Sequence, residues 1–253
     1  MTLQAATIGL PVIDPPTVQE TPDIDTSSDG YAQRFAGPIG AWLLQRQTST
    51  VLSLIRPWPS TRILEVGGGH GQLTAALLEH GYHVTVLGSD ERCGARVQSL
   101  SGPRCRFDTG NVIELPYPDR AFDVVISVRL LSHLTQWNRA VVHMARVAQA
   151  AVVVDYPTSQ SLNCLTPVLF GAKRQVEGNT RTYRLFQDQE LQTVFAAHGY
   201  VRRTRLPQFF WPMVVHRAMG RPRLSAALES LPRCVGLTRS FGSPVLASFV
   251  RQS

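Results

Sequence analysis

The feature that most constrains the fold is a glycine-rich turn between a short apolar strand and a helix, at residues 63–73, ILEVGGGHGQL. Glycine in such a turn lets the backbone take positive φ, and it leaves room for a ligand because no Cβ is present. A turn that binds a dinucleotide has the pattern G-x-G-x-x-G. Counted from Gly67, the last glycine of that pattern would fall on Gln72. The spacing therefore favours a cofactor that lacks a pyrophosphate.

The glycine turn belongs to a series in which apolar strands alternate with helices. The run at 122–128 is apolar except for Asp123 and Ser127, which is typical of a parallel strand buried on both faces. Such alternation predicts an α/β fold with a doubly wound, mostly parallel sheet that binds ligands at the carboxyl ends of its strands. The predicted strands cover residues 62–66, 83–87, 104–108, 122–128 and 151–155, and the predicted helices cover about 72–80, 91–100 and 140–148.

Further segments flank this α/β unit. Residues 1–28 are rich in Pro, Thr, Asp and Ser and predict a disordered tail. The domain is predicted over 29–253, with a helical lid over 31–54 and two insertions, 157–185 and 207–242, that would cover a bound substrate. The remaining predicted elements are helices at 162–174, 188–198 and 224–231, a strand at 200–209, and an antiparallel last strand at 244–251.

Composition indicates a soluble cytoplasmic protein. Hydrophobic residues make up 43% of the 253 residues, which is ordinary for a globular domain. No apolar run reaches the roughly 18 residues that a membrane span needs, and residues 1–30 contain no Lys or Arg of the kind that begins a signal peptide. The four cysteines are dispersed, with no pair at metal-ligand spacing, so we expect free thiols and no metal.

Charge is unevenly distributed along the chain. Residues 1–159 hold 12 Arg and 14 acidic residues, a net charge of −2. Residues 160–253 hold 12 Arg and one Lys against four acidic residues, a net charge of +9. The second part of the chain therefore carries the excess positive charge.

The glycine turn with its preceding acidic residue, Glu-x-Gly-x-Gly-x-Gly, resembles motif I of the class I S-adenosylmethionine-dependent methyltransferases. The resemblance implies that Glu65 helps to hold the ammonium group of the cofactor. The amide groups at the helix start suit its carboxylate because they form a partly positive hollow. The alternative is a tight β–α turn whose glycines serve packing alone. The glycines concerned are Gly67, Gly68, Gly69 and Gly71.

A second stretch extends the resemblance. Residues 110–123, GNVIELPYPDRAFD, are similar to the family pattern G-D-A-x-x-L-P-F-P-D-x-x-F-D. In the family the acidic residue of this pattern meets the adenine amino group, and the next backbone amide meets a ring nitrogen. Asn111 and Val112 stand at these two positions, and the Asn111 side-chain carbonyl can still accept a hydrogen bond. The resemblance covers about residues 30–155, and its nearest group contains the ubiquinone- and menaquinone-biosynthesis methyltransferases.

One position departs from the family pattern. The carboxylate that takes both ribose hydroxyls ends the second strand in the family, and here that position is Gly88. Glycine cannot accept those hydrogen bonds. Ser89 or Asp90 could reach the ribose from a reshaped loop, and Asp90 fits equally well as the cap of the following helix.

Several side chains are candidates for chemistry beside the cofactor. Val128 and Arg129 follow the fourth strand, where Arg129 could face the cofactor carboxylate, an anionic substrate or an aspartate. The resemblance gives His133 the place of a general base that takes a proton from the acceptor, whereas in the alternative it caps or packs the next helix. Candidate lid and substrate contacts are Tyr31, Arg34, Tyr156, Tyr183 and Arg184. A surface position on an amphipathic helix is the alternative for Arg34.

The basic stretch Arg202-Arg203-Thr204-Arg205, followed by aromatic residues at 209–211, has several interpretations. It could bind nucleic acid, rest on an anionic bilayer, line a pocket for an apolar anionic substrate, or form a strand with arginines on its solvent face. No lysine-rich run is present, so we expect no stable nucleic-acid partner.

The resemblance implies methyl transfer from S-adenosylmethionine to a small-molecule or lipidic acceptor, on oxygen or carbon. Two alternatives are an RNA or protein methyltransferase that docks through the basic half, and a cofactor-binding scaffold without catalysis. The sequence indicates no oligomeric state.

Overall fold

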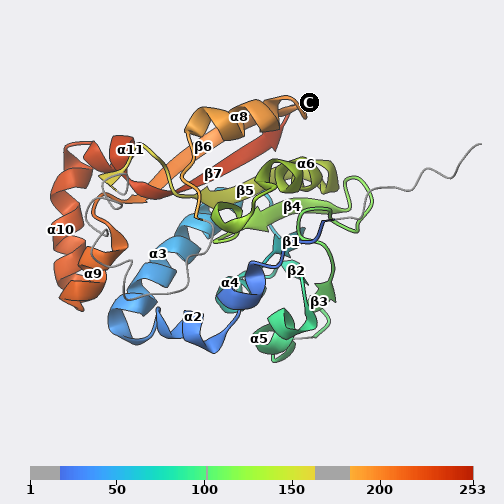
Figure 1. Ribbon diagram of the computed structural model, residues 1–253, viewed down its shortest axis with the longest axis horizontal. Helices are drawn as coiled ribbons and strands as arrows, with labels where there is room; N and C mark the ends of the chain where they lie inside the picture. Colours follow the sequence, from blue (N-terminus) through green and yellow to red (C-terminus); the bar gives the residue numbers. More distant parts are fainter. Residues whose placement is uncertain (1–17, 101, 163–182, 253) are drawn as a thin grey trace, which may run out of the picture.

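A seven-stranded sheet forms the centre of the computed structural model, which describes residues 18–100, 102–162 and 183–252 (Figure 1). The strand order is β3-β2-β1-β4-β5-β7-β6. The first five strands run parallel, and β7 is antiparallel to both of its neighbours. The doubly wound, mostly parallel fold with an antiparallel last strand is therefore confirmed. The strands are β1 Arg62–Val66, β2 His83–Gly88, β3 Cys105–Thr109, β4 Phe122–Ser127, β5 Ala148–Tyr156, β6 Tyr200–Phe209 and β7 Ser243–Arg251.

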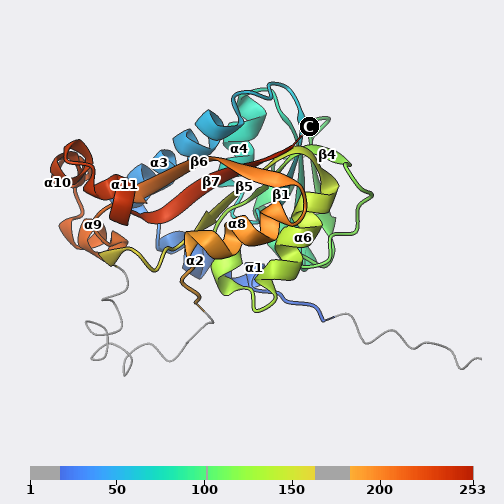
Figure 2. The same cartoon turned by 90° about the horizontal axis from the view of Figure 1, so that it is seen from above.

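Helices cover both faces of the sheet. Figure 2 shows α3 and α4 on one face and α6 and α8 on the other, whereas α9, α10 and α11 lie together at one end of the molecule. The helices are α1 Asp23–Thr26, α2 Asp29–Gln33, α3 Gly37–Ile55, α4 Gln72–Glu79, α5 Ala95–Gln98, α6 Trp137–Val147, α8 Asp188–Ala196, α9 Met213–Met219, α10 Pro222–Cys234 and α11 Leu237–Phe241, with 3₁₀ turns η1 Glu91–Gly94 and η2 Leu131–His133.

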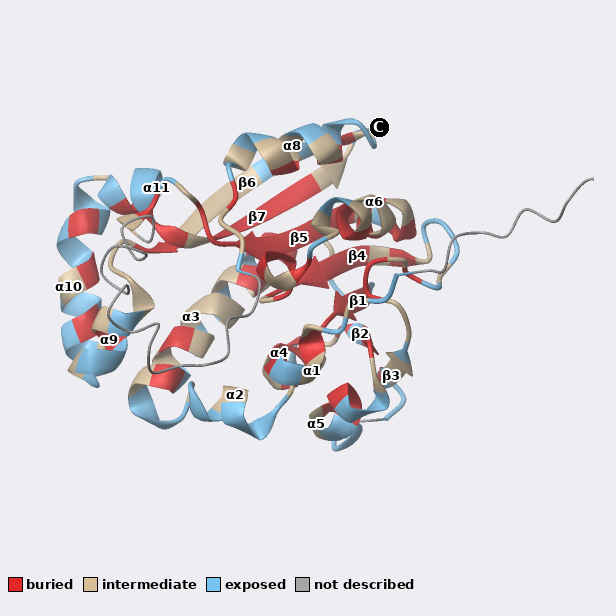
Figure 3. Ribbon diagram, in the orientation of Figure 1, coloured by how far each residue is buried: buried red, intermediate tan, exposed pale blue. Residues whose placement is uncertain are grey.

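The core consists of two apolar layers separated by the sheet, and the strands are its most buried part (Figure 3). Successive side chains of a strand point to opposite faces. Leu64 and Val66 of β1 accordingly pack in the layer under α6 and α8, and Ile63 packs in the layer under α3 and α4. In the first layer the ring of Phe195 on α8 stacks on Phe249 of β7, with 3.9 Å between the ring centroids.

Two helical segments differ from their predicted form. The region 31–54 is divided, because Ala36 is extended and a new helix, α3, begins at Gly37. Pro38 lies in its first turn, where the missing N–H is not needed. The region 91–100 is a 3₁₀ turn followed by the short α5.

The chain packs onto the domain earlier than residue 29. The tail predicted over 1–28 is wrong for residues 18–28, since Asp23 is fully buried and residues 23–26 form α1. Polar side chains and backbone groups hold this segment, and such contacts leave no hydrophobic periodicity in the sequence. The rest of the predicted tail, 1–17, and the predicted helix 162–174 from residue 163 onward lie outside the described residues.

We expect Phe195→Ala to lower the free energy of unfolding by about 3–5 kcal/mol, the usual loss for a buried phenylalanine. The stacked Phe249 would lose its partner, and α8 would lose its anchor on the sheet. Urea denaturation measures the change. Val201→Ala, at an exposed position of β6, is the matched control. An equal loss in the two variants would contradict the assignment of Phe195 to the core.

Candidate active site

A small hollow lies at the carboxyl end of β1, where a parallel sheet is expected to bind its ligand. Its volume is about 270 Å³, including the solvent space at its mouth. The glycine turn forms its floor, and the start of α4, the end of β4 and α1 form its walls. The lining residues are Thr26, Glu65, Gly67, Gly68, His70, Leu73, Val128 and Arg129.

The glycines of the turn are required by geometry. Gly67 and Gly71 have φ of +76° and +75°, values that other residues rarely adopt. A methyl group on Gly68 would collide with the carboxyl of Glu65, and one on Gly69 would collide with the hydroxyl of Ser27. The backbone of this turn can therefore lie directly against a ligand on one side and against its neighbours on the other.

Glu65 places a carboxyl group in the wall of the hollow. Its side chain is 4% exposed and accepts a hydrogen bond of 2.7 Å from the hydroxyl of Thr74 on α4. Burial raises the pKa of Glu65 from 4.5 to about 7, while Thr74 and the positive charge of Arg129 act in the opposite direction. A cation bound beside Glu65 would favour its ionised form.

Arg129 supplies the opposite charge. Its backbone has φ of +62°, and its N–H donates a hydrogen bond of 2.6 Å to Oδ1 of Asp155 on β5. Its guanidinium lies 5.3 Å from the ring centroid of Phe35 and 6.0 Å from that of Tyr31. The Nη1 atom is buried and has no hydrogen-bond partner among the described residues. A strained backbone and an unpaired buried donor are both typical of a binding site.

His70 is a lining residue that the sequence argument did not include, although its place between two glycines of the turn was a signal. Its two ring nitrogens are buried and have no hydrogen-bond partner within the described part of the chain. Burial, together with the charges of Arg129 and Arg96, lowers the pKa of His70 to about 4, so the ring is neutral at neutral pH. Its ring meets those of Tyr31 and Phe35 at 6.3 and 6.0 Å between centroids.

The hollow thus combines a buried carboxyl, an unpaired guanidinium nitrogen and a floor without side chains. An α-amino acid group carries the two complementary charges, an ammonium for Glu65 and a carboxylate for Arg129. The arrangement suits the amino-acid part of a larger ligand. No cluster of three or more potential metal ligands occurs among residues 18–100, 102–162 and 183–252.

Comparisons with known proteins show what this chain is similar to. A family model described as a methyltransferase domain matches residues 63–150. Among curated proteins, the demethylmenaquinone methyltransferase of Deinococcus radiodurans is 27% identical over 113 residues, which are 40% of this chain and 45% of that enzyme. A probable S-adenosylmethionine-dependent methyltransferase of Mycobacterium tuberculosis is 27% identical over 157 residues, 62% of this chain and 55% of that protein. Matches with the first curated relatives cover between 20% and 55% of their lengths.

A solved structure shares the whole fold. The magnesium protoporphyrin IX methyltransferase of Synechocystis PCC 6803, crystallised with S-adenosylhomocysteine, superposes with a TM-score of 0.63 over 90% of this chain and 96% of that one, at 16% identity. Residues 63–150 therefore match a methyltransferase domain, and the chain shares the fold of S-adenosylmethionine-dependent methyltransferases. This family uses S-adenosylmethionine as its cofactor.

The residues predicted beyond the turn follow β2 and β3. The carboxylate of Asp90 accepts from the backbone N–H of Arg92 at 2.9 Å and also pairs with its guanidinium, so Asp90 caps η1. These hydrogen bonds lower the pKa of Asp90 to about 2. Ser89 is buried beside Asp23. The side-chain oxygen of Asn111 accepts from the N–H of Ile113 at 3.1 Å, and Val112 is fully buried.

His133 ends η2, on the same edge of the sheet as the hollow. Its ring lies 6.0 Å from that of Tyr183, whose side chain is 58% exposed. Gln136, not His133, occupies the N-cap position of α6. Arg34 lies over the ring of Tyr31, 5.6 Å from its centroid. These side chains belong to segments that border the hollow without lining it.

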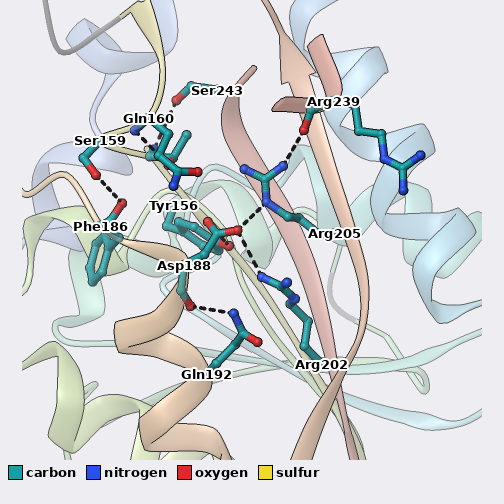
Figure 4. Close-up of polar contacts among 11 residues, drawn as sticks. Tyr156, Ser159, Gln160, Phe186, Asp188, Gln192, Arg202, Arg205, Arg239 and Ser243 are labelled. Carbon is teal, nitrogen blue, oxygen red and sulfur yellow. Dashed lines mark hydrogen bonds and ion pairs between the residues drawn. The ribbon is translucent and has the colours of Figure 1, made fainter. Parts of the chain in front are cut away.

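The two remaining candidates, Tyr156 and Arg184, bind other residues outside the hollow. The Tyr156 hydroxyl donates a hydrogen bond of 3.0 Å to Asp188, which also pairs with Arg202 and Arg205 of β6 (Figure 4). Arg184 pairs with Glu190 at 2.6 Å, and its guanidinium lies over the ring of Trp137. Neither Tyr156 nor Arg184 lines the hollow. The contacts of Tyr156 and Asp188 join β5, α8 and β6, and Arg184 contacts α8 and α6.

The raised pKa of Glu65 predicts how stability depends on pH. Between pH 4.5 and 7 the folded protein holds a proton on Glu65 that the unfolded chain has lost, so stability falls as pH rises through this range. Asp155, with a pKa raised by burial to about 6, contributes in the same direction. Glu65→Gln should therefore flatten the loss of stability between pH 5 and 7 in urea titrations. The exposed Glu79→Gln should keep the wild-type slope; a wild-type slope in Glu65→Gln would contradict the assignment.

Proposed function

We propose that this chain transfers a methyl group from S-adenosylmethionine to a small-molecule or lipidic acceptor, on oxygen or carbon. The main support for the proposal is the hollow itself. The buried carboxyl of Glu65 and the unpaired nitrogen of Arg129 both belong to residues that line it, and glycines form its floor. The similarity to this family names the cofactor, and the site offers complementary groups for it.

Residues of the hollow would hold the methionine part of the cofactor. Glu65 would face its ammonium, and Arg129 and the turn amides its carboxylate, while Asn111 and Val112 would lie beside the adenine. When bound, the cofactor supplies an electrophilic methyl group. The protein then has to exclude water and to orient the acceptor in line with the sulfur–methyl bond.

The acceptor would lie on the side of the hollow that Tyr31 and Phe35 border. Three guanidinium groups lie over these two rings at 5.3–6.0 Å: those of Arg34, Arg129 and Arg217. In the described part of the chain none of the three guanidiniums forms an ion pair with a carboxylate. Such an environment favours an acceptor with an apolar body and a negative group. His133 would take the proton that the acceptor loses.

Two arginines of the basic stretch are already paired, which argues against nucleic acid as the acceptor. Arg202 and Arg205 both contact the carboxylate of Asp188. Arg205 also donates a hydrogen bond of 2.7 Å to the backbone oxygen of Arg239. Phosphate contacts would have to replace these bonds. A small or lipidic acceptor is therefore the better supported choice.

The end of the molecule formed by α9–α11 supports a lipidic source for the acceptor. Six of the nine large apolar side chains that are exposed in the described residues lie between Val214 and Phe241. The same segment carries five arginines, and its single carboxylate, Glu229, is 2% exposed. Apolar side chains with positive charge and no exposed negative charge suit an anionic bilayer. No described helix has the length and hydropathy to cross a membrane, so we propose peripheral contact.

Arg129→Met should weaken binding of S-adenosylhomocysteine about 10- to 100-fold, the usual effect of one charge-assisted hydrogen bond. Titration calorimetry measures the affinity. Arg62→Met, at the opposite end of β1 and exposed, is the matched control and should bind like the wild type. Transfer of label from the cofactor to an extract of small molecules and lipids tests the reaction itself. Absence of both binding and transfer in the wild type would reject the proposed function.

Vesicle flotation tests the lipid contact. The wild type should float with vesicles that contain an anionic phospholipid and stay behind with zwitterionic ones. Leu224→Ser with Leu231→Ser should abolish flotation because both side chains are exposed on α10. Val201→Ser, exposed on β6, should not. Flotation that survives the double change, or a dimer that the double change dissociates, would contradict the membrane assignment.

A further inference from the structure

The end of β2 has no room for a ribose-binding carboxylate. A Cβ added to Gly88 would lie 2.7 Å from Cζ of Phe107 and 2.8 Å from Cβ of Cys93. Real Cβ atoms do not approach other atoms so closely, so a side chain at this position would require the ring of Phe107 on β3 and the Cβ of Cys93 to shift. Asp90 does not fill the gap either, because its carboxylate caps η1 and pairs with Arg92.

A carboxylate is nevertheless present at this edge of the sheet, and it comes from the N-terminal side of the chain. Asp23 is fully buried, and its Oδ2 accepts a hydrogen bond of 2.7 Å from the backbone N–H of Ser89, 66 residues away. Its Oδ1 accepts one of 2.5 Å from the hydroxyl of Ser89. The carboxylate of Asp23 therefore lies at Ser89, the residue after Gly88, where the family's carboxylate is missing.

The segment that carries Asp23, residues 18–27, forms a strap across the carboxyl ends of the strands. The side-chain amide of Gln19 donates a hydrogen bond of 2.9 Å to the backbone oxygen of Ser89. The Glu20 carboxylate accepts from the backbone N–H groups of Thr135 and Gln136 at 2.6 and 2.7 Å.

The strap also reaches the two ends of the proposed cofactor site. At one end, the side-chain amide of Asn111 donates a hydrogen bond of 3.3 Å to the backbone oxygen of Val18. At the other end Thr26 lines the hollow. One continuous segment thus touches the places assigned to the adenine, the ribose and the methionine.

We propose that Asp23 is the ribose-binding carboxylate of this methyltransferase, supplied by the strap in place of a residue at the end of β2. The inference rests on the proposed function and names one more ligand of the same cofactor. Ser89 presents two donors, an N–H and an O–H, to the two oxygens of Asp23. The vicinal hydroxyls of a ribose present two donors of the same kind. A carboxylate has about four acceptor positions, so Asp23 can bind the diol while it keeps the Ser89 N–H.

The buried state of Asp23 adds a requirement on dynamics. Because the carboxylate is fully covered, a ribose can reach it only if the strap lifts and then closes over the bound nucleoside. Asp23 would then select a ribonucleoside cofactor, since a 2′-deoxy analogue lacks one of the two donors.

Titration calorimetry with S-adenosylhomocysteine tests the assignment of Asp23, because the variants of Asp23 and Ser89 should change the affinity in different directions. Asp23→Asn should weaken binding about 10- to 100-fold, because an amide replaces a charged acceptor of two hydrogen bonds. Ser89→Ala should bind at least as tightly as the wild type, since it removes a donor that competes with the ribose. Asp29→Asn, whose exposed carboxylate pairs with Arg96, is the matched control and should leave the affinity unchanged.

A 2′-deoxy analogue of S-adenosylhomocysteine provides a second measurement that needs no variant. The wild type should bind it more weakly than the parent compound, and Asp23→Asn should bind the two compounds with a smaller difference. If Asp23 only fastens the strap over the site, Asp23→Asn and Ser89→Ala will both strengthen binding, and that result overturns the inference. Unchanged affinity in Asp23→Asn overturns it as well. Failure of the wild type to bind S-adenosylhomocysteine would instead reject the proposed function.

Discussion

The buried carboxyl of Glu65 is the constraint on which the rest of the site depends. A carboxyl placed in an apolar interior is held neutral unless a cation and hydrogen bonds accompany it. Thr74 provides a hydrogen bond, and Arg129 provides a positive charge in the same hollow. The turn must then be glycine at Gly68, because a side chain would displace the carboxyl. Arg129 has a φ of +62°, and its N–H donates a hydrogen bond to Asp155.

Much of the fold could be predicted from the sequence because its signals are local. Mostly apolar runs of five to seven residues mark strands buried on both faces, and the run at 122–128 contains β4. The glycine spacing predicts the hollow and the place of Glu65. A turn with left-handed φ at positions 67 and 71 requires glycine there, whatever surrounds the turn. Such requirements do not depend on distant parts of the chain.

The rest depends on contacts between residues far apart in sequence. The bonds of Asp23 to Ser89 join residues 66 positions apart and leave no periodicity to detect, so the segment was predicted as a tail. Tyr156 ends β5, where a site residue is expected, yet its hydroxyl donates a hydrogen bond to Asp188 on α8. That choice depends on how α8 packs, which the local sequence does not specify. Arg129 was predicted from its place at the sheet edge, but its unpaired nitrogen became evident only from the packing around it.

The ring of Phe107 beneath Gly88 has a consequence for how such a site can change. An aspartate introduced at Gly88 alone would overlap that ring, and a smaller residue at Phe107 alone would leave a void against Cys93 and Gly94. Each single change is unfavourable, and a carboxylate at the end of β2 would need both the ring of Phe107 and the Cβ of Cys93 to move. The packing around this position, on the β3 side and on the η1 side, therefore keeps residue 88 a glycine.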